Sequence, residues 1–214
     1  MRAILTFAII FSSITNCAIA GSTNVNDFYN KIMQAHKLYS EGRTKDALNM
    51  WLSTEKNFDI ENLKVSNLDK SSLYYQICLA IKKNPNEHDI LKEKIYYCSK
   101  SFEYIDKNSA EIKKKLKATG SKVELNSILI SLHIRLAESY YWFYDFYGGE
   151  ENLELAEKHA LKYLNIKKKK DDGRIFATLS FIYFKKQNIE KSIHYRKKAI
   201  DSNECNSNEI PLNY

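Results

Sequence analysis

The sequence is poor in the residues that build tight turns. Its 214 residues include only six glycines and two prolines. A β-sandwich or a β-barrel needs many short strands joined by turns that are rich in these residues, so both folds are disfavoured. A chain of this length has room for one domain or a short repeat array, and long helices with short connections fit the composition better.

Sequence signatures of catalysis are also missing. The chain has no Cys-x-x-Cys pair, no Gly-x-Ser-x-Gly elbow and no glycine loop of the kind that binds phosphate. Its histidines lack the spacing of a helical zinc site, and we expect them on the surface or in a groove: His36, His88, His133, His159 and His194. We therefore predict that the protein is not an enzyme and binds no metal or cofactor.

The first 20 residues have the three-part layout of a secretory signal. Arg2 gives a positive start, roughly residues 3 to 11 are apolar, and Ala18-Ile19-Ala20 supplies the small residues of a cleavage site. The apolar run is too short to span a membrane. We predict cleavage after Ala20 and an exported chain, periplasmic or secreted, with no transmembrane segment in its mature part. A lipoprotein anchored through Cys17 is the alternative.

Charge does not point to nucleic acid. The formal net charge is +7, and removal of the signal with Arg2 lowers it to +6. Lysine runs at Lys113–Lys115 and Lys167–Lys170 lie near predicted helix ends, where cations suit the helix dipole, and acidic residues are interspersed along the chain. The chain also has no Asn-x-Ser/Thr sequon, which favours a bacterial periplasm or outer surface over a glycosylating compartment.

Three cysteines remain after cleavage, so at most one disulfide can form within the mature chain, and hydrophobic burial must hold the fold. Cys78 and Cys98 lie on neighbouring predicted helices around the Asn84-Pro85-Asn86 turn. Either a disulfide joins them or both are buried free thiols. Cys205 is either free or paired between two chains.

Apolar residues recur at helical spacing along the mature chain. Gly42, Gly120 and the pair Gly148-Gly149 mark helix ends, because glycine readily adopts the left-handed conformation that closes a helix. The segment around Ile112 and Leu116 is either a helix or a connector. We expect eight or nine helices in four hairpins, with boundaries near Phe28–Gly42, from Thr44, Ser66–Lys83, Ile90–Ile105, Val123–Tyr147, from Asn152, Gly173–Lys186 and Asn188–Asp201.

Three of the hairpins share small and aromatic residues where their paired helices should meet. The patterns are Ala35-x-x-Leu38 with Ala47 and Trp51, Leu136-Ala137-x-x-Tyr140 with Ala156, Ala160 and Tyr163, and Phe176-x-x-Leu179-Ser180-x-x-Tyr183 with Ser192, Tyr195 and Ala199. They resemble the tetratricopeptide repeat (TPR), a helix pair of about 34 residues. The resemblance implies an all-α fold, a TPR-like α-solenoid of about four antiparallel helix hairpins.

We divide the chain accordingly into a signal peptide over residues 1–20, a TPR-like domain over residues 21–202 and a polar C-terminal tail over residues 203–214. In such a solenoid the first helix of each pair lines the concave side, where partner segments bind. The resemblance therefore implies a partner-binding face made of Tyr29, His36, Tyr39, Glu138, Tyr141, Trp142, Arg174, Phe181 and Lys185.

The segment Tyr140–Tyr147 holds seven aromatic residues in eight positions. A helix can bury only part of its circumference, so some of these rings must lie on a second face. Either the rings form a bulky core and cover the region under the Gly148-Gly149 loop, or they form a recognition surface. Tyr141 and Trp142 lie about 100° and 200° around the helix from Tyr140, so we expect both to be spare to the core.

These features predict an exported scaffold or adaptor that holds a partner protein or peptide in the groove of a helical repeat array. One alternative is a periplasmic helical-repeat component that binds a small molecule for a solute transporter. Another is a secreted effector that acts by binding. A closed apolar pocket among the aromatic residues would favour a small-molecule ligand, and an open groove would favour a peptide.

Export is testable directly, because cleavage after Ala20 leaves a mature protein that begins at Gly21. N-terminal sequencing of the native protein should read Gly-Ser-Thr. Finding an intact Met1 would contradict both the predicted location and the argument that the cysteines meet an oxidising compartment.

Overall fold

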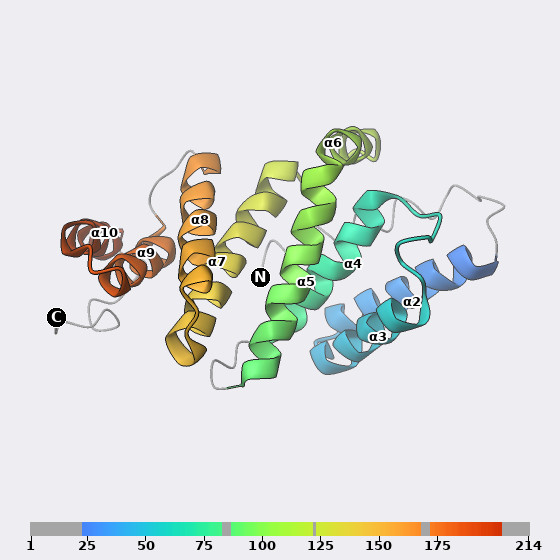
Figure 1. Cartoon of the computed structure of the whole chain (residues 1–214). Coiled ribbons are helices and arrows are strands. Elements are labelled where there is room, and N and C mark those ends of the chain that lie inside the picture. The colour runs from blue at the N-terminus through green and yellow to red at the C-terminus, as the bar shows by residue number, and fades with distance from the viewer. Residues whose placement is uncertain (1–22, 83–86, 122, 168–171, 203–214) are drawn as a thin grey trace. The chain divides into compact units, whose positions relative to one another are not determined.

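The computed structural model describes residues 23–82, 87–121, 123–167 and 172–202, and its regular elements there are all α-helices. Together with their packing in adjacent pairs, this confirms the all-α, hairpin-based fold class. The helices labelled in Figure 1 are α2 (Thr23–Ser40), α3 (Thr44–Asn57), α4 (Asn67–Ala80), α5 (His88–Lys107), α6 (Ser109–Ala118), α7 (Leu125–Tyr147), α8 (Glu150–Ile166), α9 (Gly173–Lys185) and α10 (Ile189–Asp201).

The helices fall into two compact units. The first contains α2, α3, α4, α6 and most of α5, and the second contains the start of α5, most of α7, and α8 to α10. Among the helices of the described residues, none combines enough length and hydrophobicity to span a membrane. The predicted signal over residues 1–20 with Cys17, the predicted turn Asn84-Pro85-Asn86 and the predicted tail over residues 203–214 with Cys205 lie outside the described residues.

In the first unit, α2 and α3 form the predicted hairpin. Gly42 has φ +81° in the turn, and the Arg43 amide donates to the Leu38 carbonyl at 2.9 Å, which closes the end of α2. Ala47 and Trp51 of α3 are both fully buried. A small side chain lets the two backbones approach, and the indole fills the remaining space.

Helix α4 is buried around almost its whole circumference. It begins where the sequence predicts, because the Ser66 side chain caps it by accepting from the Asp69 amide at 3.2 Å. A disulfide joins Cys78 of α4 to Cys98 of α5, so of the two alternatives the structure has the bridge. Beside it the buried Lys94 ammonium donates to the Cys78 carbonyl in the last turn of α4 at 2.9 Å, and to the carbonyl of Ile81, the residue directly after the helix.

In the second unit, α7 and α8 meet at two glycines. Gly148 and Gly149 have φ +80° and +88°, a backbone conformation that is strained for residues with a side chain. Helix α8 begins at Glu150, so the predicted start at Asn152 is wrong. Asn152 lies in the first turn instead and donates from its side chain to the Gly148 carbonyl at 3.2 Å. Acidic Glu150 and Glu151 occupy the first turn, where the helix dipole favours them.

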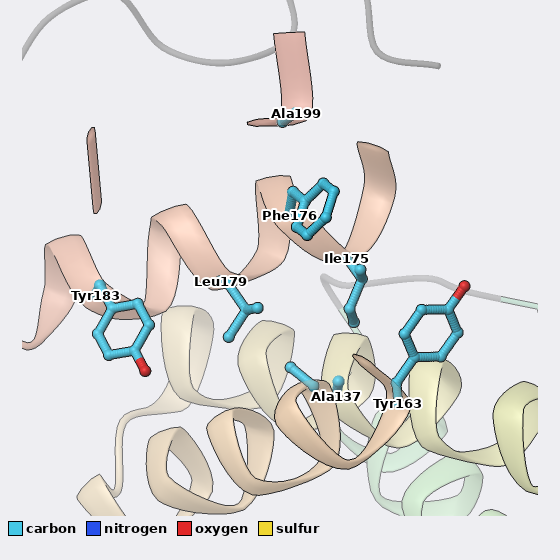
Figure 2. Packing of buried hydrophobic residues seen from close by; sticks show 8 residues of the cluster. Ala137, Tyr163, Ile175, Phe176, Leu179, Tyr183 and Ala199 are labelled. Carbon is cyan, nitrogen blue, oxygen red and sulfur yellow. The ribbon is translucent and has the colours of Figure 1, made fainter. Parts of the chain in front are cut away.

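The core of the second unit is built from α7, α8, α9 and α10. Figure 2 shows Ile175 and Leu179 of α9 pointing toward Ala137 of α7, and all three are fully buried. The same cluster contains Ala160, Tyr163, Phe176, Tyr183 and Ala199. These are residues of the TPR-like pattern, so the small and aromatic positions form the packing between helices, as predicted.

Candidate protein-binding face

Two stripes of predicted partner-binding residues lie on α7 and α9. At about 100° per residue, Glu138, Trp142 and Asp145 share one side of α7, with Tyr141 at its edge. Arg174, Phe181 and Lys185 share one side of α9 by the same rule. We call these seven residues the α7/α9 face.

Ion pairs join the two stripes at both ends. The Arg174 guanidinium donates to Glu138 Oε1 from Nη2 at 2.5 Å and from Nε at 3.1 Å. Seven residues further along α7, Asp145 Oδ1 lies 2.7 Å from Lys185 Nζ. The contacts follow the same order in both helices, so α7 and α9 run in the same direction on this face. Six of the nine predicted residues are therefore brought together, and Asp145 joins them.

Burial differs sharply along the face. The side chain of Arg174 is 58% exposed and that of Glu138 only 8%. Burial lowers the pKa of Arg174, but the charge of Glu138 and its hydrogen bond outweigh this effect and raise it overall. The face therefore presents a fixed cation whose counter-ion is held beneath it.

Tyr141 belongs to the core, so the expectation that it is spare to the core is wrong. Its side chain is only 6% exposed and packs with Leu153, Ala156 and Ile182. Its ring stacks on that of Phe181, with 5.8 Å between centroids. The physical reason is that α7 has two neighbours: α8 covers one side, and α9 covers the side that a single hairpin would leave open.

The rest of the aromatic run extends toward the surface. Trp142 is half-buried and its ring lies 6.1 Å from that of Phe146, while Phe146 and Tyr147 are 44% and 40% exposed. His88, at the start of α5, contacts Phe143 and Tyr147 with ring centroids 5.2 and 4.7 Å away. The nine predicted partner-binding residues include neither Phe146 nor His88, although Phe146 belongs to the aromatic segment Tyr140–Tyr147 that the sequence offers as a recognition surface.

The three predicted residues of α2 lie in the first unit. Tyr29 donates to Asp69 Oδ2 at 2.9 Å, and Lys115 lies 3.0 Å from the same oxygen. Burial, with Asp69 close by, raises the pKa of Tyr29 well above its usual range. The Tyr39 ring packs against Trp51 with 5.6 Å between centroids.

His36 is a core residue rather than a groove residue, which corrects the prediction. It is 9% exposed, its ring lies edge-on to Trp51 at 5.5 Å, and burial lowers its pKa to about 4. The neighbouring α3 helix covers the side of α2 from which it projects.

A second correction concerns His133 and His159, which are also buried. Their Nδ1 atoms lie 2.9 Å apart, and the Tyr140 ring stacks on His159 with 5.9 Å between centroids. Burial, then the charges of His133 and Lys158, lower the pKa of His159 to about 3. Within the described part of the chain, no group of three or more His, Cys, Asp or Glu side chains could hold a metal ion.

A cavity of about 460 Å³ lies in the first unit, between the end of α6 and the start of α7. Its lining includes Lys113, Lys117 and Glu124 beside Leu116 and Leu125. It contains none of the predicted partner-binding residues and none of the aromatic run.

Comparison with known proteins identifies no family for this chain. No family model matches the sequence, and no curated protein matches it. A solved structure described as "MamA RS-1 ArsTM double mutant" aligns with 86% of this chain and 97% of its own, at 15% identity and a TM-score of 0.36. At this level of similarity the match carries no functional argument.

The buried histidines predict a loss of stability in mild acid. A histidine in the unfolded chain has a pKa near 6.5, whereas the pKa is about 3 for His159 and about 4 for His36 in the folded protein. Below about pH 6.5 the unfolded chain therefore binds more protons than the folded one. The free energy of unfolding is thus highest above about pH 6.5 and falls as the pH is lowered. His159→Gln should destabilise the protein at every pH but reduce the slope of the urea-unfolding free energy between about pH 6.5 and 4, by up to about 1.4 kcal/mol per pH unit. The exposed His194→Gln is the matched control. Equal slopes in both variants would contradict the account.

Proposed function

We propose that the protein is an exported scaffold or adaptor that holds a segment of a partner protein on the α7/α9 face and the adjoining aromatic end of α7. Its location is periplasmic or secreted. The chemistry of the role is binding, without catalysis and without a cofactor.

The observation that carries this proposal is the pairing of charges and rings along the face. Arg174 and Lys185 stand at its two ends, held by Glu138 and Asp145, with the stacked Tyr141 and Phe181 rings between them. Because these contacts fix the side chains before any partner arrives, binding would cost little side-chain entropy.

The exposed groups suit a peptide. Arginine carries five N–H donors, of which two point to Glu138, and more than half of the Arg174 side chain is exposed. The half-buried Trp142 and the exposed Phe146 offer a large apolar contact area beside it. Such a surface can accept both the backbone carbonyls and the apolar side chains of an extended or helical segment.

The cavity near α6 bears on the small-molecule alternative. A transporter component would be favoured by a closed apolar pocket among the aromatic residues. The cavity has charged side chains in its lining, and none of its lining residues belongs to the aromatic run. This cavity is therefore not the pocket that the small-molecule alternative requires.

A pull-down of the mature protein from its own envelope fraction, read by quantitative mass spectrometry, tests the proposal. The double variant Trp142→Ala with Phe146→Ala should lose the captured partner, because a central aromatic anchor contributes about 2 kcal/mol or more, roughly thirtyfold in affinity. The control is Tyr96→Ala, which removes another exposed ring, 46% accessible, on α5.

Melting temperature and helical content must be measured for each variant. If half-buried Trp142 proves necessary for folding, Phe146→Ala alone should still weaken capture. A partner retained equally by the wild type, the double variant and the Tyr96→Ala control would refute the assignment of the face.

A further inference from the structure

The last helix, α10, exposes an apolar stripe. Ile189, Ile193 and Ile200 are 47%, 56% and 39% exposed. They are three of the six large hydrophobic side chains that stand exposed within the described residues, although α10 has only 13 residues. Single exposed apolar residues are common on protein surfaces, but three on one short helix indicate a surface that another protein segment covers.

Helix geometry places the three isoleucines together. At about 100° per residue they fall within roughly 40° of one another, along about 16 Å of the axis. The side of α10 that packs on α9 is a different one, marked by the buried Ser192 and Ala199. The stripe is therefore not used in closing the α9/α10 hairpin.

Two opposite charges border the stripe on its solvent side. Glu190 and Lys197 are both exposed and lie about 80° to 100° around the helix from Ile189. They are seven residues apart, close to two full turns, so the acid flanks one end of the stripe and the base lies toward the other.

We propose that a second copy of this chain covers the stripe, with the two α10 helices packed antiparallel about a two-fold axis near residue 194. In this arrangement, a residue that lies a given number of positions before 194 faces the residue of the partner subunit that lies the same number of positions after 194. Ile189 then faces the partner subunit's Ile200, and Ile193 lies close to the partner subunit's Ile193 beside the axis. The offsets are one or two residues, or about 1.5 to 3 Å.

The bordering charges match the same axis. Glu190 comes level, within one residue, with the partner subunit's Lys197, and Lys197 with the partner subunit's Glu190. The three isoleucines and the pair Glu190 and Lys197 are thus self-complementary on this helix surface, as a two-fold interface requires. A parallel pairing would set Glu190 beside the partner subunit's Glu190 and lose this match.

A contact through one short helix is smaller than the roughly 1,200 Å² that stable complexes bury, so the dimer should be weak, with a Kd on the order of tens to hundreds of micromolar. This inference is independent of the proposed function, because it uses none of the residues of the α7/α9 face.

Sedimentation equilibrium of the mature protein from about 10 to 500 µM tests the dimer, a range that spans the expected Kd. The wild type should associate reversibly, and Ile193→Glu should weaken association at least tenfold, because it sets two carboxylates side by side at the axis. Tyr96→Glu is the matched control: it also replaces an exposed large side chain, 46% accessible on α5, with an acid, and its association should be unchanged.

A charge exchange tests the antiparallel register itself. Glu190→Lys and Lys197→Glu should each weaken association several-fold, and the double exchange should restore it. A chain that stays monomeric at 500 µM, an Ile193→Glu variant that associates as the wild type does, or a double exchange without rescue would each overturn the proposal. Monomeric wild type together with a lowered melting temperature in Ile193→Glu would instead assign the cover to the chain's own residues.

Discussion

Helices pair in this protein where small residues let their backbones meet, and two of the pairings use the same hydrogen bonds. In α4 and α5, the Ser71 hydroxyl donates to the Ser101 carbonyl at 3.3 Å and the Ser101 hydroxyl donates to the Ser71 carbonyl at 3.0 Å. Ser180 and Ser192 repeat this exchange between α9 and α10 at 3.0 and 2.9 Å. Each buried hydroxyl donates to a carbonyl of the facing helix, so the two helices approach closely without leaving a buried hydroxyl unpaired.

Close crossings decide which sides of each helix remain for other neighbours. Once α8 occupies the small-residue side of α7, the side bearing Glu138, Tyr141 and Asp145 is left for α9. The rings and charges there pair with Arg174, Phe181 and Lys185, and the remaining aromatic residues reach the surface. The proposed binding face thus results from the packing of helices, because all of its residues lie on α7 and α9 and none lies on a loop.

The sequence predicts most of the helices because their periodicity and their glycine ends are local signals, as at Gly42 and Gly148. It also predicts which side chains gather on α7 and α9, since residues three, four and seven apart share a side. It fails for Tyr141 and His36, because their burial depends on packing partners some 15 to 40 positions away: Trp51 of the paired helix for His36, and Phe181 of the next hairpin for Tyr141. The partners of His133 and Lys94 are hidden for the same reason: His159 and the Cys78 carbonyl are distant in sequence.

The side-by-side, parallel arrangement of α7 and α9 is the claim on which the rest depends, and zero-length coupling by a carbodiimide tests it most directly. The reagent joins a carboxylate to an amine only where the two groups touch, and Asp145 Oδ1 lies 2.7 Å from Lys185 Nζ. Mass spectrometry of the coupled and digested protein should find the Asp145–Lys185 amide, beside a Glu157–Lys186 amide from the neighbouring ion pair of α8. If the second product forms while Lys185 couples only to other acids, α9 does not lie along α7 in this register.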